Sequence, residues 1–336
     1  MTAPVWLGPV SVHHPPEAVA VAELPEVAAL PAARRDHVLS LGIDEVRCLR
    51  DHRGRAGPGA EVDLAAAAAH QALARADLAA DDLDALILVQ GRAPQYLLAS
   101  EATRLQARIG ATRAATLSVG DLGCVSVSAA IDVGVALLRG RPAWRHVLVA
   151  MGAVAATAER YRPPMTVLGD AGAAVLLGRE TGRWGWIDHR LRSDGTYADL
   201  FHIDYRDVPS NRWRETCSDE LTYSFRLAME SRNRLRDLNR EVLATRDLTP
   251  DRLDAVLMQN LSRGAFAFWQ GALDVKIGDA CPANLARYGH LGPIDVLANL
   301  DDTAADVPPG GHVLVMNSSP VAAWSSALLV RGTGGR

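Results

Sequence analysis

Two kinds of hydrophobic pattern alternate along the first half of the chain. Short apolar runs predict strands at residues 5–12, 83–90, 115–119, 146–151 and 173–177, with a shorter strand near 46–49. Longer stretches with apolar residues at helical spacing predict helices at residues 62–76, 100–109 and 125–140. Strands that alternate with helices are typical of an α/β fold with a mostly parallel central sheet.

Two segments lack such a pattern. A Pro-containing turn and a polar connection through Ala33 to His37 follow the first strand, and residues 42–58 are rich in Arg and Gly. We expect both segments to be irregular surface connections, apart from the short strand near residue 46.

Three segments of the first half return, in the same order, in the second half. DDLDALILVQ (81–90) is echoed by PDRLDAVLMQN (250–260), RHVLVAMGA (145–153) by GHVLVMNSS (311–319), and AAVLLGR (173–179) by SALLVRG (326–332). A repeated order of this kind predicts two copies of one structural unit. His146 and His312 lie 166 positions apart, and the same offset pairs Cys124 with His290, each directly after a Gly.

Composition limits the classes of function. The chain has 336 residues, of which 49% are hydrophobic, and its net charge of -4 is spread without long runs, which argues against nucleic-acid binding. The N-terminus shows no basic region followed by an apolar run, and no segment is judged to reach the roughly 18 apolar residues of a membrane span. We therefore expect a cytoplasmic protein that enters no membrane.

One of the four cysteines stands in a reactive context. Cys48, Cys124, Cys217 and Cys281 are far apart and form no CxxC or mixed Cys/His pattern, so neither a disulfide framework nor a zinc site is indicated. Cys124 follows Gly123 and precedes an apolar helix, where free amides and the helix dipole stabilise a thiolate able to attack thioesters. A small buried hydrophobic residue is the alternative interpretation.

Several motifs together resemble a known family. DLGCVSVSAAIDVGVALLRG, VLGDAGAAVLLG and NSSPVAAWSSALLVRG are similar to the active-site Cys helix, the FGDGAGA motif and the final turn and strand of the thiolase superfamily, in the branch of β-ketoacyl-ACP synthase III. The resemblance implies duplicated βαβαβαββ halves in a five-layer αβαβα arrangement. Residues 1–180 would carry the nucleophilic Cys and residues 181–336 the His and Asp. It also implies a homodimer that pairs through the strand near Leu117.

The chain departs from the condensing members of that branch at two positions. They use Cys, His and Asn, of which the His and Asn hold the thioester carbonyl of the malonyl donor and stabilise the enolate formed by decarboxylation. Here LMQNLS places Met258 at the His and YGHLGPIDVLANL places His290 at the Asn. The GHxGxxD pattern is similar to a subgroup from natural-product pathways and implies a triad of Cys124, His290 and Asp295. Because Pro293 favours a helix start, His290 would lie in the preceding turn, free to fold back over Asp295. A structural His and a helix-capping Asp are the alternatives.

Three further residues are weaker candidates. Gln259 and Asn260 lie where the family's active-site loop would run and can hydrogen-bond a substrate, although a polar strand end explains them equally. By analogy, the amide of Cys124 and an amide near Ser319 would form an oxyanion hole.

The resemblance leads to an expected function and two alternatives. We expect an acyltransferase that moves an acyl group from an acyl carrier protein (ACP) or CoA, through acyl-Cys124, to a hydroxyl or amine of a small polyketide-type intermediate. The alternatives are a starter-unit synthase that condenses acyl-Cys with malonyl-ACP, and a catalytically silent partner subunit. No metal or redox cofactor is expected.

Overall fold

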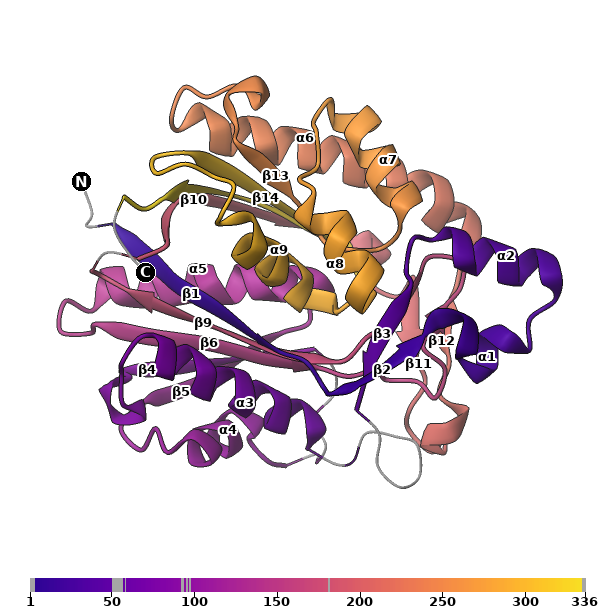
Figure 1. The fold of residues 1–336 in the computed structure, drawn as a ribbon, viewed down its shortest axis with the longest axis horizontal. Coiled ribbons are helices and arrows are strands. Elements are labelled where there is room, and N and C mark those ends of the chain that lie inside the picture. The colour runs from indigo at the N-terminus through magenta and orange to yellow at the C-terminus, as the bar shows by residue number, and fades with distance from the viewer. Residues whose placement is uncertain are drawn as a thin grey trace.

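The computed structural model describes residues 4–49, 57, 59–91, 94, 96, 98–180 and 182–333. The chain folds as α/β in five layers, helices outside and in the middle and strands between them (Figure 1). Helices α3 (Ala60–Arg75) and α4 (Glu101–Ile109) cover one outer face, and α6 (Ala228–Ala244) covers the other. Between the two strand layers lie α5 (Ser126–Gly140) and α9 (Asp295–Thr303), so the predicted fold class is confirmed.

Nine strands form one continuous sheet in the order β13-β14-β15-β10-β1-β9-β6-β4-β5. Their bounds are β1 Val5–His13, β4 Ala85–Gln90, β5 Ala115–Gly120, β6 His146–Ala153, β9 Ala171–Gly178, β10 Trp184–Ser193, β13 Ala255–Leu257, β14 His312–Ser319 and β15 Ala323–Arg331. Three small two-stranded sheets pair β2 (Glu17–Ala20) with β3 (Glu45–Cys48), β7 (Tyr161–Arg162) with β8 (Thr166–Val167), and β11 (Phe201–Ile203) with β12 (Glu215–Cys217). The remaining helices are α1 Pro25–Ala28, α2 Ala32–Ser40, α7 Arg263–Leu273 and α8 Ala280–Tyr288.

The order of strands confirms the internal repeat. On each side of the sheet, four strands follow one another toward the centre: β4-β6-β9-β1 on one side and β13-β14-β15-β10 on the other. In both series the first pair of strands is parallel and the next two pairs are antiparallel. The halves join where β1 pairs antiparallel with β10. Asp84 and Asp254 make the same contact, each accepting a hydrogen bond from the backbone of His146 (2.9 Å) or His312 (2.8 Å).

The central strands are apolar because both of their faces are covered. On β4, Leu86 and Leu88 pack in the cluster under α3 and α4, while Ile87 and Val89 pack on the opposite side with α5. Alternation sends successive side chains to opposite faces, so a strand between two helix layers needs apolar residues at every position.

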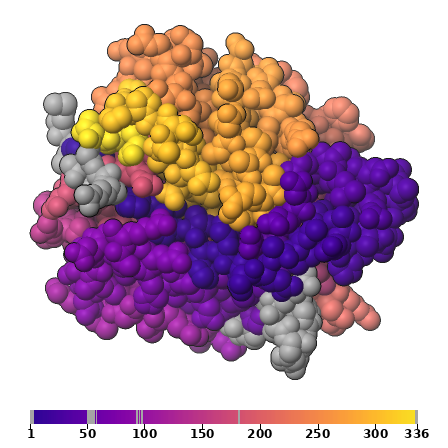
Figure 2. All heavy atoms as spheres, viewed as in Figure 1, coloured from indigo at the N-terminus to yellow at the C-terminus, as the bar shows by residue number. Residues whose placement is uncertain are grey.

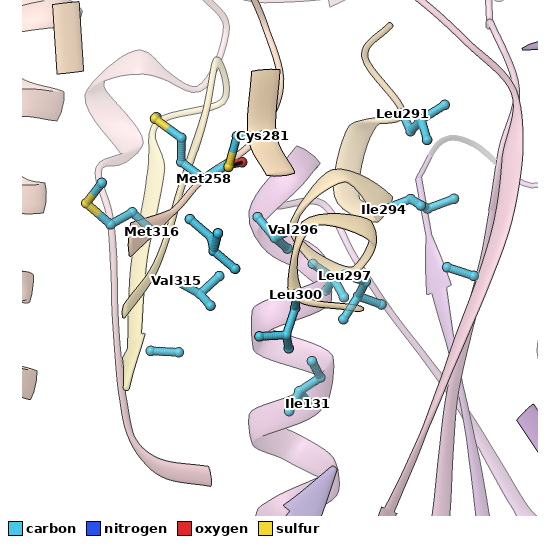
Figure 3. Close-up of a cluster of buried hydrophobic side chains, with 14 of the residues drawn as sticks. Ile131, Met258, Cys281, Leu291, Ile294, Val296, Leu297, Leu300, Val315 and Met316 are labelled. Atoms are coloured by element: carbon cyan, nitrogen blue, oxygen red, sulfur yellow. Dashed lines mark hydrogen bonds between the residues drawn. The ribbon is translucent and has the colours of Figure 1, made fainter. Parts of the chain in front are cut away.

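Helix α5 corrects one expectation drawn from hydropathy. The 18 residues Gly123–Gly140 are long and apolar enough, by length and composition alone, to cross a membrane, contrary to the expectation that no segment would be. More than half of this stretch is buried inside the protein. Figure 3 shows Ile131 of α5 in the apolar cluster with Val296, Leu297 and Leu300 of α9. The helix is hydrophobic because it lies between the two strand layers of the nine-stranded sheet.

The connection after β1 also differs from expectation. Residues 33–37 belong to α2, whose only buried side chain is Val38, so the helix carries no apolar stripe that a periodicity search detects. The short strand near residue 46 is confirmed as β3, whereas residues 50–56 and 58 of the expected loop lie outside the described residues. Figure 2 shows this N-terminal segment, in indigo, as a band between the purple and the orange parts of the surface.

Candidate active site

Cys124 lies in a tight turn at the start of α5. A single 3-10 turn, Gly123–Val125, precedes the helix, and Gly123 has φ +54°, in the left-handed region. A Cβ at Gly123 would stand 2.4 Å from the Oγ of Ser319, so this position accepts no side chain without a shift of its neighbour. Glycine therefore lets the Cys turn pack directly against the end of β14.

His290 lies just before the corresponding turn of the second half and is held by the chain around the GDAG motif. Its backbone N-H donates to the carbonyl of Val167 (2.9 Å), and its carbonyl accepts from the N-H of Gly169 (3.1 Å). At Gly289, with φ +66°, a Cβ would meet the Val167 carbonyl at 2.5 Å. Because Gly289 on one segment and Gly169 on the other have no side chains, the backbone of His290 can pair with residues 167–169.

The turns before α5 and α9 have the same internal hydrogen bonds. In the first, the N-H of Leu122 donates to the Oγ of Ser126 (3.2 Å), and in the second, the N-H of Leu291 donates to Oδ1 of Asp295 (2.8 Å). Each turn also contains a left-handed glycine, Gly123 with φ +54° or Gly292 with φ +62°. Ser126 and Asp295 therefore occupy equivalent positions at the start of their helices.

This equivalence shows that the expected pairing of Cys124 with His290 by sequence offset is wrong. With Gly123 matched to Gly292, the residue that corresponds to Cys124 is Pro293. The offset of the strands does not extend to the turns because the connections between them differ in length. His290 reaches Cys124 from a position two residues before Gly292, where the turn of its own half begins.

The structure brings Cys124, His290 and Asp295 together as a relay. The Sγ of Cys124 is 3.5 Å from Nε2 of His290, and Nδ1 of His290 is 2.6 Å from Oδ2 of Asp295. Asp295 is the first residue of α9, as the Pro-containing turn predicted to within two residues. The exposed fractions are 7% for Cys124, 3% for His290 and 0% for Asp295, so the sulfur is the outermost member.

The surroundings of His290 favour its charged form. Burial alone would lower its pKa, but the carboxylate of Asp295 and the sulfur of Cys124 stabilise the imidazolium and raise the pKa to about 10. Asp295 also accepts backbone hydrogen bonds from Leu291 (2.8 Å) and Asn260 (2.8 Å). These donors fix both carboxylate oxygens and leave Oδ2 directed at the imidazole.

The weaker candidates hold the site together through other contacts. The side chain of Gln259 donates to the carbonyl and hydroxyl of Ser318 at 3.1 and 2.6 Å, which ties the end of β13 to β14. Asn260 contributes its backbone N-H to Asp295, and its side chain pairs with Asn299. Ser319 lies against Gly123 and accepts from the N-H of Val321 (3.2 Å). All three therefore lie next to the relay or the Cys turn.

Sequence reasoning missed two buried asparagines near the site. Asn317 donates from Nδ2 to the carbonyl oxygen of Cys124 (2.6 Å), and Asn299 donates to the carbonyl of Met258 (2.8 Å). Both are fully buried and follow apolar residues, Met316 in β14 and Ala298 in α9. An amide inside such a segment is the signal that would have indicated them, because a buried polar group needs partners.

The other cysteines lie outside the relay. Cys281 is buried on α8 and donates weakly to the carbonyl of Met258 (3.8 Å), and burial raises its pKa to about 12. Cys124, Cys217 and Cys281 are free thiols. Across the described part of the chain, no group of three or more His, Cys, Asp or Glu side chains is arranged to hold a metal ion.

Comparison with known proteins finds similar synthases. No protein-family model matches the chain. It is 31% identical over 150 residues to β-ketoacyl-ACP synthase III of Desulfotalea psychrophila, a match that covers 44% of this chain and only about half (46%) of the relative. A longer match, 26% identical over 274 residues, covers 79% of this chain and 83% of the protein of the same name from Granulibacter bethesdensis.

Solved structures extend the likeness to nearly the whole length. The 3-oxoacyl-ACP synthase III of Aquifex aeolicus superposes with a TM-score of 0.77 at 18% identity, over 97% of this chain and 99% of that one. The chain is similar to β-ketoacyl-ACP synthase III and has the fold of the thiolase superfamily. ChlB3, named as an acyltransferase, has a TM-score of 0.80 at 20% identity and 98% coverage of both chains. AbyA1, named as a tetronic acid condensing enzyme, has 0.79 at 21% identity and covers 97% and 99%. At these identities the likeness shows the thiolase fold.

Within this superfamily, Met258 is the position where the condensing members' His is expected. In Figure 3 its side chain points the same way as that of Met316, away from α9. Its carbonyl accepts a hydrogen bond from Nδ2 of Asn299 (2.8 Å). A thioether has no hydrogen to donate, so the side chain of Met258 cannot supply the hydrogen bond that an imidazole would.

Proposed function

We propose that this protein is an acyltransferase that carries the acyl group on Cys124 and passes it to a hydroxyl or amine of a small molecule. The observation that carries the proposal is the relay itself: a thiol 3.5 Å from an imidazole whose other nitrogen lies 2.6 Å from a buried carboxylate. A nucleophile, a base within reach and a group that orients the base are the parts of covalent acyl transfer.

The first half-reaction loads the thiol. His290 Nε2 takes the Sγ proton, and the thiolate attacks the carbonyl carbon of the donor thioester. The tetrahedral intermediate collapses as the bond to the donor sulfur breaks, and the imidazolium returns its proton to that sulfur. The donor leaves as a free thiol, and Cys124 holds the acyl group as a thioester.

The second half-reaction depends on the loss of negative charge at the Cys124 sulfur when it is acylated. Once acylated, the sulfur no longer stabilises the imidazolium, so the pKa of His290 falls from its raised value and the imidazole can act as a base. It removes the proton of the acceptor O-H or N-H as that atom attacks the acyl carbon. The Cys124 sulfur departs as a thiolate, and the imidazolium–thiolate pair forms again. Throughout, Asp295 accepts a hydrogen bond from the Nδ1-H of His290 and thereby keeps Nε2 directed at the sulfur.

An oxyanion hole completes the proposal. The Cys turn and the Ser319 turn lie in contact at Gly123, which supports the amide of Cys124 and an amide of the Ser319 turn as the two donors. No metal or redox group takes part in these steps, since every proton and electron pair stays among thiol, imidazole, thioester and acceptor.

Transfer is favoured over condensation by the orientation of Met258. Decarboxylation of malonyl-ACP needs hydrogen-bond donors for the enolate oxygen. Met258 supplies none, because a thioether cannot donate and its side chain points away from α9. Losing one such donor costs about 100-fold or more in rate. Acyl transfer forms no enolate and needs only a base and an oxyanion hole.

Similar proteins support the classes of partner. The names of the synthase III relatives include the acyl carrier protein, and ChlB3 is named as an acyltransferase. We propose an ACP or CoA thioester as the donor and a polyketide-type intermediate as the acceptor, in the cytoplasm.

A loading experiment tests the nucleophile. Purified protein is incubated with candidate acyl-CoA and acyl-ACP donors, and its intact mass is measured. A single acyl adduct is expected, absent in Cys124→Ala and retained in Cys281→Ala, which removes another buried thiol. Adducts that persist in Cys124→Ala contradict the assignment. Lack of adducts with every donor supports a catalytically silent subunit.

Turnover separates transfer from condensation. His290→Ala should lower acyl transfer by about 100- to 10,000-fold, the range for loss of a general base, and Asp295→Asn should slow it by leaving the imidazole misoriented. Acyl-loaded protein should release little CO₂ from malonyl-ACP. Formation of a β-ketoacyl product at an ordinary catalytic rate would establish the starter-synthase alternative.

A further inference from the structure

A cluster of buried asparagines lies directly behind the relay. Asn299 stands one helical turn after Asp295 on α9, and its amide uses all of its hydrogen-bonding capacity. Its Nδ2 donates to the carbonyl of Met258 (2.8 Å) and to Oδ1 of Asn260 (2.9 Å). Its Oδ1 accepts from Asn260 (3.3 Å) and from Asn284 (3.1 Å).

We propose that Asn299 is a positioning residue for the relay: it clamps residues 258–260 so that the backbone N-H of Asn260 stays on Oδ2 of Asp295, the oxygen that orients His290. The inference rests on the proposed role of the relay in acyl transfer. It assigns to Asn299 a function in setting the reactivity of Cys124, beyond filling the core.

The geometry supports this chain of effects. Asn299 is bonded to the segment on both sides of Gln259, through the Met258 carbonyl and the Asn260 side chain, so the intervening backbone has little freedom to rotate. The Asn260 N-H and His290 Nδ1 then meet the same oxygen of Asp295, at 2.8 and 2.6 Å. Because residues four apart share a face of a helix, Asn299 and Asp295 approach the segment from the same side.

The burial of the cluster makes each contact consequential. The exposed fractions of Asn299 and Asn260 are 0% and 1%, so water is not at hand to replace a lost partner. A buried amide or carbonyl left without a partner is strongly disfavoured, and the backbone shifts to find one. Loss of the Asn299 amide should therefore release the Asn260 N-H from Asp295.

Few titratable groups face the imidazole. They are Cys124 on the turn before α5 and Asp295 on α9. Cys281 of α8 interacts electrostatically with Asp295. Burial raises the pKa of Cys281 to about 12, so that thiol stays neutral between pH 5.5 and 9.5. A change in the pH dependence of Cys124 over this range therefore reports on His290 and Asp295.

The test measures how fast Cys124 is alkylated by iodoacetamide between pH 5.5 and 9.5, followed by intact mass in a Cys48→Ala/Cys217→Ala/Cys281→Ala background. Only the thiolate reacts, and the oriented imidazolium stabilises it. With Asn299→Leu, of similar size but without the amide, the profile should move to higher pH by about one unit, a tenfold lower rate at pH 6.5. Asp295→Asn should move it the same way, and the double variant no further than Asp295→Asn alone.

Asn284→Leu is the matched control. Asn284 is also buried and also hydrogen-bonded to Asn299, but within the described part of the chain its side chain has no hydrogen bond to residues 258–260. It should lower the unfolding midpoint in urea yet keep the alkylation profile within about twofold of the parent. Should Asn299→Leu fail to fold, Asn299→Ser is substituted, because its shorter side chain cannot bridge Met258 and Asn260.

The outcomes are distinct. An unchanged profile in a folded Asn299 variant overturns the proposal, as does an equal shift in Asn284→Leu, which would reduce the effect to general loss of packing. Alkylation requires no acyl donor, so it remains informative if acyl loading fails. If His290→Ala leaves the profile unchanged, it is the relay, and with it the proposed function, that fails.

Discussion

The protonation of His290 is linked to the folded state. Burial opposes its charge, but Asp295 and Cys124 outweigh burial and raise its pKa from 6.5 to about 10. A group whose pKa is raised on folding binds its proton more tightly in the native state. The charged histidine therefore stabilises the fold, within a window that its two pKa values define.

We expect this stabilisation to depend on pH in one direction. It is fully present below about pH 6.5, where both folded and unfolded states hold the proton, and it is lost as the pH rises toward about 10. The free energy of unfolding of the wild type should therefore exceed that of His290→Gln by most at pH 6 and by least at pH 10.

Urea denaturation at pH 6, 8 and 10 checks this. Cys124→Ala is the companion variant, because it removes one of the two groups that stabilise the imidazolium. In this background, too, the stability that His290 contributes is the difference in free energy of unfolding between Cys124→Ala and Cys124→Ala/His290→Gln. We expect this difference to decline at lower pH than the corresponding difference between the wild type and His290→Gln. A difference that grows with pH would show that the histidine is buried in its neutral form.

At the scale of elements, two turns place the reacting groups, and glycine is required in them for different reasons. Gly123 has both a left-handed backbone and no space for a side chain, since a Cβ would meet Ser319 at 2.4 Å. Gly292 has φ +62° with open space around it. Gly140, at the end of α5, has neither constraint.

This difference predicts a graded series. Gly140→Ala should leave stability unchanged or raise it by about 0.5 kcal/mol, because alanine is less flexible in the unfolded chain. Gly292→Ala should cost about 1–2 kcal/mol from the left-handed conformation alone. Gly123→Ala should cost more than Gly292→Ala and also slow alkylation of Cys124, because the Cys turn must move away from Ser319.

The measurement is urea denaturation of the three variants, with iodoacetamide labelling as the second readout. Equal stability losses in Gly123→Ala and Gly292→Ala would mean that the contact with Ser319 yields at no cost.

At the scale of the whole molecule, β5 is the last strand of the nine-stranded sheet. It pairs with β4 on one side, and Ser118 is exposed while Leu117 and Val119 are half-buried. An edge strand of this length offers unpaired backbone groups to a second chain. Two-fold pairing at this edge is what the resemblance described in the sequence analysis leads us to expect.

We therefore predict a homodimer with about twice the 35.9 kDa mass of the chain. Light scattering after size exclusion at micromolar concentration measures it. Ser118→Lys should weaken the dimer, because a lysine at an edge blocks strand pairing. Thr216→Lys, on exposed β12, is the control and should remain dimeric. A monomeric wild type would contradict the prediction.

Much of the fold follows from local patterns in the sequence. The apolar runs predicted β4, β6 and β9 because strands covered on both faces need hydrophobic side chains throughout, and their return in the same order indicated two copies of one unit. The Gly before Cys124 and the Gly-Pro before Asp295 indicated the two turns, since φ preferences are properties of single residues. Cys124 was named from its place between a Gly and an apolar helix, whereas His290 and Asp295 were named through the resemblance of the GHxGxxD pattern to a known subgroup.

Contacts between distant segments decided the rest. The sequence offset paired Cys124 with His290, but the connecting segments differ in length between the halves and shift the turns. Only the folded chain shows that Ser126 and Asp295 occupy equivalent positions in the two turns. Helix α2 escaped detection because it buries one side chain. The roles of Asn299 and Asn317 depend on partners up to 193 positions away, and no local pattern encodes which carbonyl a buried amide will meet. Local preferences determine the elements, whereas packing determines which polar groups face each other.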